Sequence, residues 1–479
     1  MGLFDQFPYT NFHELNLDWL IERMKHCLSV VDGINANIDA AVEREIEKLV
    51  ETGEFEQFLY NMFKEHTDNA VLWGADPTGV DDSSVVINKM LSTIGSCYLP
   101  NGIYRIDESI VIPSDARLYG QSTDGVILKA YRNGPVAVIK SATYDLYHNT
   151  DTINGDTSFE IKDLTVDGNG RGMIGIALYG YKYHIANVDI RKCTDGFYSE
   201  WGSSNGFAEN GNVMHSVIEN VTIGNCTSHV AQFFGPHDSY IDKLVGHNCV
   251  SGLYIVKKAS NANRANGTVL SNSHIFSIQK TGIYITDYCY LDNVVSESNG
   301  GDGIYAESEC KMYNCTIFNN GGNGLTIAAN ISQAIVKNAS CYQNTGKDIV
   351  IGANVKNSII NAQTFSADSG KIAVNSGLLT KEANSYNNHI HIVSASPFHG
   401  IDYAPMALST VEIPETSPYV NTTGRSANVI VYGSNDCKLL FTGSTVNMKA
   451  EQSYPLPCGA SITWTTKPST ILLMYNPIN

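Results

Sequence analysis

The chain has 479 residues, a formal net charge of −17 and a hydrophobic content of 43%. No apolar run approaches the roughly 18 residues of a membrane-spanning helix, and the N-terminus shows no basic and apolar stretch typical of a secretory signal. Because Lys and Arg form no cluster, nucleic acid and anionic membranes are poor candidates for partners, and membrane insertion is not expected.

The cysteine pattern indicates unpaired thiols. Eleven cysteines occur, an odd number, and none shows the CxxC or Cys/His spacing of a zinc site. In a large chain without a visible signal, this pattern is typical of free, mostly buried thiols in a protein made in a reducing cytoplasm. No cofactor and no metal is expected.

Residues 1–71 differ from the rest because their apolar residues recur at helical spacing. One stripe has a mean step of 3.6 residues and consists of Val31, Ile34, Ile38, Val42, Ile46 and Leu49. Such a helix is not stable alone, so it predicts a partner, either downstream structure or another copy of the chain. The preceding FPYTNFHELNLDWLIERM predicts a second short helix, either packed in a core or docked on another protein through Phe12, Leu15, Leu17, Trp19 and Leu20.

The stretch WGADPTGVDDSSVVIN at 73–88 raises the question of a metal or phosphate site. Asp76, Asp81 and Asp82 lack the spacing of an EF-hand loop, and GxxxxGK[ST] is absent. DPTG instead predicts a turn, and Asp82 or Ser83 is placed to cap a short helix over 83–94. The apolar face of that helix would cover the open end of the structure that follows.

After Trp73 the pattern changes to short β-branched segments with an internal repeat. A glycine followed by strand-forming residues marks each copy, and Gly282, Gly303 and Gly324 are 21 residues apart. The other markers are Gly175, Gly196, Gly252 and Gly346, with His229 in the glycine position of one degenerate copy. A period near 21 residues with three short strands per copy predicts a parallel solenoid whose coils stack about 4.8 Å apart.

Side chains at equivalent positions of such coils form ladders. Three residues before a marker stand Cys193, Cys226 and Cys249, which we expect to stack inside the solenoid as small apolar fillers. Four residues before a marker stand Asn225, Asn248, Asn299 and Asn320, which we expect to form a ladder of amides at a turn.

The period fades near residue 395. Residues 396–416 are Pro-rich and indicate a linker, and residues 417–479 alternate like a small antiparallel β-sandwich. The expected organisation is therefore all-β, with a helical segment at 1–71, a solenoid at 72–395, the linker and a C-terminal β-domain.

GADPTGVDDSSVVINKML followed by CYLPNGIYRIDESIVIPSDARLYGQS resembles the start of the pectate-lyase-like right-handed β-helix of bacteriophage tailspikes and appendages. The resemblance runs through the coils to about residue 395. It implies a right-handed parallel β-helix whose N-terminal end is capped by the helix at 83–94. It also implies a homotrimeric virion protein, held to phage tail or collar/connector proteins through its N-terminus.

Proteins of that family often bind, and sometimes cleave, surface glycans with pairs of carboxylates. Asp287 and Glu307 fall on consecutive coils, within pairing distance, and are the predicted catalytic pair. The residues predicted to contact the glycan on neighbouring coils and insertions are Glu200, Trp201, Lys257 and Glu309.

Three functions are consistent with this sequence. The leading one is a phage tail-fibre-like appendage, located in the virion, that attaches to host cell-surface glycan and degrades it in some relatives. The alternatives are a polysaccharide or teichoic-acid depolymerase, as hydrolase or lyase, and a purely structural spike.

Overall fold

This computed structural model describes residue 48 and residues 68–134, 136–150, 155–201, 215–257, 267–366, 369–375, 378 and 388–394, together with the strands between 401 and 475. The chain divides into two compact units, Met1–Thr67 and Asp68–Asn479. All described residues except Lys48 belong to the second unit. The expected docking residues Phe12, Leu15, Leu17, Trp19 and Leu20, and the helical stripe at 31–49 apart from Lys48, lie outside the described residues.

The stretch at 73–88 forms a hydrogen-bonded turn followed by a helix. Asp76 accepts hydrogen bonds from the backbone N–H groups of Thr78, Val80 and Asp81 at 2.8–2.9 Å, and these bonds lower the pKa of Asp76 to about 2. Helix α4 (Ser84–Thr93) follows, and the Asp82 carboxylate accepts the Ser84 N–H at 3.0 Å. The aspartates therefore shape the turn and begin the helix, as predicted.

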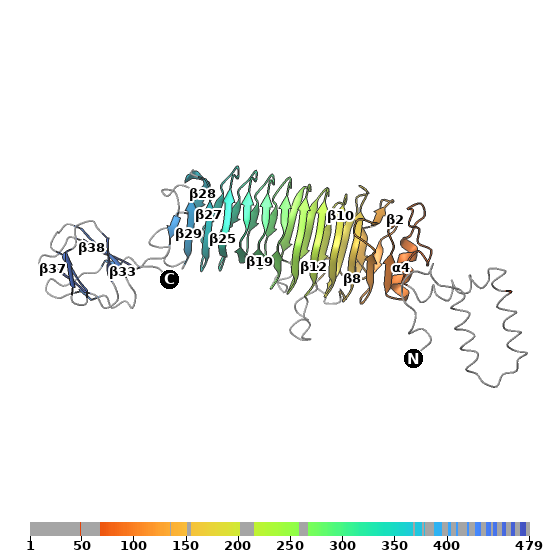
Figure 1. Cartoon of the computed structure of the whole chain (residues 1–479), viewed down its shortest axis with the longest axis horizontal. Helices are drawn as coiled ribbons and strands as arrows, with labels where there is room; N and C mark the ends of the chain where they lie inside the picture. The colour runs from red at the N-terminus through yellow and green to blue at the C-terminus, as the bar shows by residue number, and fades with distance from the viewer. Residues whose placement is uncertain are drawn as a thin grey trace, which may run out of the picture. The chain divides into compact units, whose positions relative to one another are not determined.

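Helix α4 closes the N-terminal end of a stack of coils (Figure 1). It packs against β1 (Ser96–Leu99) and β3 (Ile110–Ile112) and buries Ile87, Met90 and Leu91. A second, four-residue helix is α5 (Tyr144–Tyr147), and a short 3₁₀ turn, η2, spans Ser369–Lys371.

The first sheet contains two strand positions of each coil and is almost entirely parallel. Its strands are β1 (Ser96–Leu99), β2 (Gly102–Ile106), β4 (Arg117–Gly120), β5 (Val126–Ala130), β8 (Glu160–Asp167), β10 (His184–Arg191), β12 (Val217–Gly224), β14 (Tyr240–His247), β16 (Val269–Ser271), β17 (His274–Phe276), β19 (Cys289–Asp292), β20 (Val295–Glu297), β22 (Cys310–Tyr313), β23 (Thr316–Phe318), β25 (Ile335–Tyr342), β27 (Ile359–Thr364), β29 (His389–Ser394) and β30 (Ile401–Tyr403).

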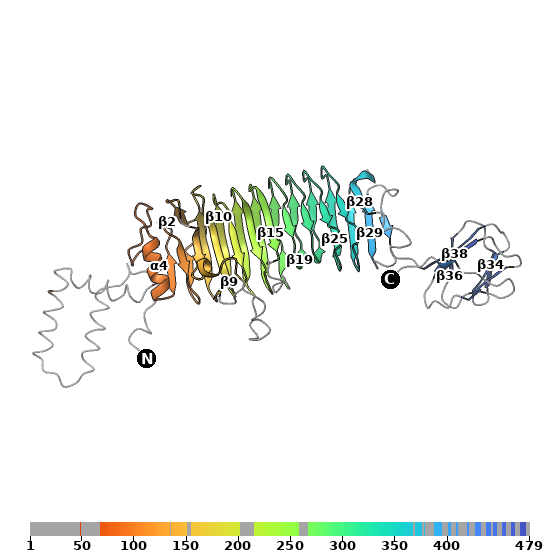
Figure 2. The ribbon, with the colours of Figure 1, turned by 180° about the vertical axis from the view of Figure 1, so that it is seen from behind.

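The second sheet contains the third strand of each coil. Its strands are β3 (Ile110–Ile112), β6 (Ala137–Ser141), β9 (Ile174–Tyr181), β11 (Phe197–Glu200), β13 (His229–Phe234), β15 (Ser251–Val256), β18 (Ile283–Ile285), β21 (Ile304–Ala306), β24 (Leu325–Ile327), β26 (Ile349–Ile351) and β28 (Ile372–Val374), and β7 (Asp156–Thr157) pairs with β9. Figure 2 shows the stack from behind. The predicted right-handed parallel β-helix is confirmed.

Most coils from β8 to β25 bend within the first sheet at a residue with positive φ, usually asparagine. Asn187 and Asn220 have φ of 54° and 51°, and the Asn220 amide donates to Asn187 Oδ1 at 2.7 Å. Asparagine tolerates this left-handed backbone, and its amide also bonds to the next coil. The bend splits the later strands in two, so that β14 pairs with both β16 and β17.

The interior consists of ladders of aliphatic side chains in register. One ladder is Ile185, Ile218, Ile241, Leu270, Leu291, Met312, Val336, Ile360 and Ile390, all buried. Every coil therefore repeats the same buried contact with its neighbours, and this gives the chain its period of about 21 residues.

The cysteines stack as predicted. The register of β10, β12 and β14 makes Cys193, Cys226 and Cys249 equivalent, and each is at most 3% exposed. The Cys226 N–H donates to Cys249 Sγ at 3.3 Å. The eight cysteines in the described part of the chain are free and buried, which agrees with the expectation of unpaired thiols.

The asparagine prediction was partly wrong. Asn225 and Asn248 have φ of 57° and 52° and belong to a turn, whereas Asn299 and Asn320 continue the cysteine ladder in later coils. In that ladder Asn299 Nδ2 donates to Asn320 Oδ1 at 2.9 Å, and Asn320 Nδ2 donates to Asn344 Oδ1 at 2.9 Å. The same interior position therefore holds cysteine in early coils and asparagine in late ones.

Two repeat markers were also misplaced. Val230, and not His229, is equivalent to Gly196 and Gly252, because β13 aligns Ala231 with Phe197 and Leu253. The last marker is Asp348 instead of Gly346, since Leu325 aligns with Ile349. Spacing alone does not reveal these shifts of one and two residues, because insertions at the turns change the number of residues between equivalent positions of successive coils.

The strands after residue 400 include two antiparallel sheets. One contains β31 (Ser409–Thr410), β33 (Ala427–Tyr432), β36 (Ser453–Leu456) and β38 (Thr470–Tyr475), and the other contains β32 (Tyr419–Val420), β34 (Cys437–Phe441), β35 (Ser444–Asn447) and β37 (Ser461–Trp464). Within the expected linker at 396–416, β30 pairs antiparallel with β29 and β31 pairs with β38. Among the described residues, no helix has the length and apolarity to cross a bilayer.

Candidate functional site

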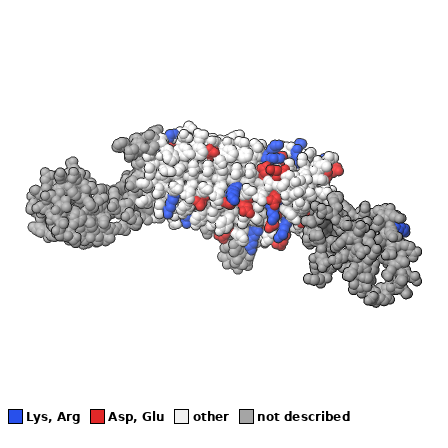
Figure 3. All heavy atoms as spheres, in the orientation of Figure 1, with Lys and Arg blue, Asp and Glu red and all other residues white. Residues whose placement is uncertain are grey.

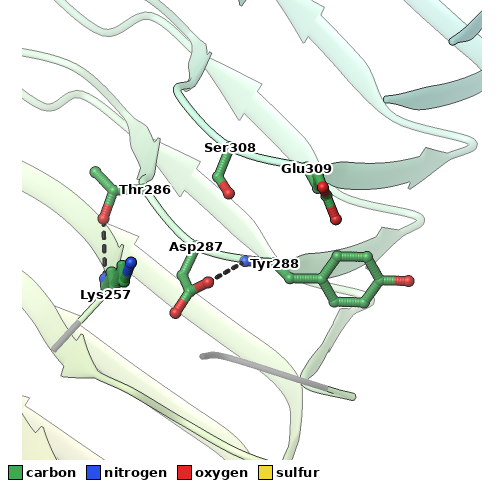
Figure 4. Close-up of a pocket in the computed structure, with 6 residues that line it drawn as sticks. All are labelled: Lys257, Thr286, Asp287, Tyr288, Ser308 and Glu309. Atoms are coloured by element: carbon green, nitrogen blue, oxygen red, sulfur yellow. Dashed lines mark hydrogen bonds between the residues drawn. The ribbon is translucent and has the colours of Figure 1, made fainter. Parts of the chain in front are cut away.

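Three successive coils form a pocket at one corner of the β-helix. Lys257 follows β15, Asp287 and Tyr288 follow β18, and Glu309 follows β21. The register makes Lys257, Asp287 and Ser308 equivalent, so their backbones stack one above another. The pocket has a volume of about 140 Å³, and Thr286 and Ser308 complete its lining (Figure 4). We call it the Asp287 pocket.

The Asp287 carboxylate is held in place by its surroundings. Its side chain is almost fully buried, and the Tyr288 N–H donates to Oδ1 at 2.8 Å. Lys257 is fixed through its backbone N–H, which donates to Thr286 Oγ1 at 2.9 Å (Figure 4). The pocket therefore brings together three predicted site residues, Asp287, Lys257 and Glu309, and offers an ammonium and two carboxylates to a polar ligand.

Glu307 does not line this pocket. It is exposed and stands one position before the residue equivalent to Asp287, because Thr286 aligns with Glu307 and Asp287 with Ser308. Its carboxylate meets the Tyr284 hydroxyl, and together with burial this interaction raises the pKa of Tyr284 to about 12. The carboxylate that shares the pocket with Asp287 is Glu309.

Glu200 and Trp201 lie elsewhere, at the end of β11. Glu200 is 2% exposed, and its Oε1 accepts the Tyr198 hydroxyl at 2.7 Å and contacts His148 Nδ1 at 2.7 Å. Trp201 is 0% exposed and donates through Nε1 to Ser239 Oγ at 3.1 Å. The prediction that Trp201 stacks on a ligand was wrong, because its ring packs on Tyr183 and Phe233 inside the core.

A row of tyrosines that was not predicted from the sequence lies on the same three coils as the pocket. Tyr254, Tyr284 and Tyr305 lie in register on β15, β18 and β21, half-buried on the outer face of the second sheet. Their ring centroids are 5.0 and 5.7 Å apart. We call them the tyrosine ladder. The signal was present in GLYI, GIYI and GIYA, where a tyrosine follows each marker glycine by two residues.

Aromatic and basic groups continue beyond the pocket. Tyr288 lines it, and the Tyr288 hydroxyl donates to the Tyr290 hydroxyl at 2.7 Å. Lys311 Nζ donates to the Tyr290 hydroxyl at 3.1 Å and lies 4.6 Å from the centre of that ring. The hydrogen bond from Tyr288 and the Lys311 charge lower the pKa of Tyr290. Through Tyr288, the Asp287 pocket is thus linked to the hydroxyl of Tyr290 on β19 and the ammonium of Lys311 on β22.

Comparison with known proteins places the chain near phage appendages. Residues 68–152 match a sequence model of the family described as rhamnogalacturonase A/epimerase, pectate lyase-like. The preneck appendage protein of Bacillus phage PZA is 23% identical over 246 residues, which are 46% of this chain and 27% of that protein. The pre-neck appendage protein of Bacillus phage B103 is 24% identical over 139 residues, 28% of this chain and 16% of that protein.

The chain also aligns with a solved phage structure. The pre-mature gene product 12 of bacteriophage phi29 aligns over 73% of this chain and 60% of that chain, at 14% identity and a TM-score of 0.45. This chain spans about a quarter or less of the length of the two appendage proteins that it matches in sequence. The sequence matches confirm the resemblance to phage appendage proteins with a pectate-lyase-like β-helix.

Proposed function

We propose that this protein is a bacteriophage appendage, carried on the virion as a homotrimer, that attaches the particle to a glycan of the host cell surface. The observation that carries the proposal is that the tyrosine ladder and the Asp287 pocket lie on the same three coils. Half-buried tyrosine rings and their hydroxyls, beside carboxylates and an ammonium, match the alternating apolar and hydroxyl groups of sugars. The sequence similarity to pre-neck appendage proteins supports the virion location.

A binding experiment tests this proposal. In the Asp287→Asn variant the new amide oxygen still accepts the Tyr288 N–H, but the negative charge is gone. We expect binding to purified host cell walls to fall at least about tenfold, the loss of one charged hydrogen bond. Sedimentation with cell walls measures the effect, and Asp115→Asn, which changes an exposed aspartate far along the chain, serves as the control. Undiminished binding by Asp287→Asn argues against this pocket.

Glycan cleavage is the second candidate, and one observation favours it. Asp287 and Glu309 line a single pocket, and Asp287 is 3% exposed, so one carboxyl is shielded while the other is more accessible. Such a pair supplies an acid and a base for glycoside cleavage. Incubation with host-wall glycans, followed by assays of reducing ends and of unsaturated products, separates a hydrolase from a lyase. If the protein binds the glycan but forms neither product, attachment is its function. If it does not bind the glycan, a structural spike is indicated.

The N-terminal segment is proposed to join the protein to tail or collar/connector proteins. Deletion of residues 1–27 removes Phe12, Leu15, Leu17, Trp19 and Leu20 but keeps the helical stripe at 31–49. We expect the truncated protein to remain a trimer by light scattering, to bind host walls, and to be absent from particles in an in vitro assembly assay. Incorporation of the truncated protein into particles, or host binding by the isolated N-terminal peptide, would reverse the assignment.

A further inference from the structure

A second and larger cleft lies on the first sheet, away from the corner that holds the Asp287 pocket. It has a volume of about 470 Å³ and is lined by strands β10, β12 and β14 and by the turn between β4 and β5. Its chemically active groups are Asp124, Asp189, Arg191, Thr222, Asn225 and His247. We call it the Asp189 cleft. Its volume is within the range of pockets that hold a small ligand.

The strand register builds the floor of the cleft. Asp189 aligns with Thr222, and two residues later Arg191 aligns with Gly224 and His247. Gly224 is needed here, because a Cβ at this position would collide with the His247 ring. That ring stacks on Phe276 with centroids 5.3 Å apart, which fixes its position beside the cleft.

The turn that carries Asp124 is hydrogen-bonded to strands β8 and β10. Thr123 Oγ1 donates to the Asn187 carbonyl at 2.8 Å, and Thr165 Oγ1 donates to the Thr123 carbonyl at 2.8 Å. Asp124 is therefore held at the rim, exposed, and its carboxylate has no hydrogen-bond or ion-pair partner among the described residues. The cleft has a fixed shape before any ligand arrives.

The carboxylates in the cleft are only partly neutralised by its arginine. Arg191 donates through Nε to Asp167 at 3.0 Å and reaches Asp189 only at 3.5 Å. Burial raises the pKa of Asp189, and the negative charge of Asp124 adds to this effect against the opposing charge of Arg191. A cationic group between Asp124 and Asp189 would relieve their repulsion. Figure 3 shows that Lys and Arg lie among Asp and Glu on the face drawn, so the surface has no broad patch of one sign there.

We propose that the Asp189 cleft binds a sugar that carries a protonated amine, as a glycan contact separate from the Asp287 pocket. The two carboxylates match the ammonium group, and the threonine hydroxyl, the asparagine amide and the ring nitrogens of His247 match the hydroxyls of a sugar ring. This inference rests on the proposed attachment to a host glycan and adds the chemical class of one of its sugars.

The experiment compares two probes on the full-length protein by isothermal titration calorimetry. One is a tetramer of glucosamine, with free amines, and the other is its fully N-acetylated form. We expect the wild type to bind the amine form at least about tenfold more tightly, and Asp189→Asn and Asp124→Asn each to lose about tenfold. Glu108→Gln, which neutralises an exposed carboxylate outside the cleft, should bind like the wild type. Thermal melting checks that each variant is folded.

Three results would overturn the inference. They are equal affinity for the two tetramers, unchanged affinity in both aspartate variants, and displacement of the tetramer by millimolar Ca²⁺, which would make the cleft a cation site. A parallel measurement of binding to host cell walls distinguishes a failure of this inference from a failure of the proposed function. If Asp287→Asn abolishes wall binding while the glucosamine tetramer binds nowhere, only the present inference fails. If wall binding is undetectable in the wild type, the proposed attachment fails.

Discussion

The Cys226→Asp variant is expected to lose the folded β-helix at ordinary temperature. Cys226 is 3% exposed between Cys193 and Cys249, and its Sγ lies 3.6 Å from the carbonyl oxygen of Gly224. A carboxylate at this position would be buried without a partner, and the free energy of unfolding should fall by at least about 4 kcal/mol. Because each coil packs only on its neighbours, the damage should interrupt the stack at this coil. Soluble yield, thermal melting and resistance to protease measure the loss.

An exposed residue one coil further along supplies the control. Asn248 precedes Cys249 and has φ of 52°, a conformation that aspartate also tolerates. Asn248→Asp therefore adds the same charge beside the cysteine ladder but leaves it in water, and its melting temperature should stay near that of the wild type. Equal melting of Cys226→Asp and the wild type would contradict the buried position of the cysteine ladder.

Asn320→Ala is expected to produce the second large effect. Asn320 Oδ1 accepts the backbone N–H of Asn299 at 3.1 Å and its side-chain Nδ2 at 2.9 Å, while Asn320 Nδ2 donates to Asn344. Alanine leaves both donors of Asn299 without this acceptor in a dry interior. Each unsatisfied buried group costs about 1–3 kcal/mol, so the free energy of unfolding should fall by about 2–4 kcal/mol. Chemical denaturation followed by circular dichroism measures it.

The interior position shared by cysteine and asparagine suggests a variant that restores part of the lost stability. In early coils cysteine occupies this position, and Cys249 Sγ accepts the N–H of Cys226 at 3.3 Å. Asn320→Cys should therefore keep one of the two hydrogen bonds from Asn299 and be more stable than Asn320→Ala. If the two variants are equally stable, the asparagine ladder contributes by shape alone and not through its hydrogen bonds.

The sequence by itself determined the architecture, because a parallel β-helix repeats the same buried contacts in every coil. A period near 21 residues, short β-branched strands and a cysteine at the same step of three coils are local signals of that repetition. The same regularity placed Asp287, Lys257 and Glu309 on neighbouring coils, and the structure brings them into one pocket. The turn at 73–82 and helix α4 were also predictable, since turn and capping residues act over a few positions.

Only the tertiary structure decided which side chains face outward and which carboxylates share a site. Asp287 is equivalent to Ser308, so Glu307 and Glu309 each stand one residue from the equivalent position, and only the conformation of the turn after β21 brings Glu309 into the pocket. A shift of one residue also changes the repeat, where Val230 replaces His229. Trp201 is buried because the core closes around it, which composition could not show. The Asp189 cleft joins residues 124, 189 and 247. Such a site depends on how the coils stack and on which strands hold the turn at Asp124 by hydrogen bonds. Neither can be predicted from the spacing of residues along the sequence.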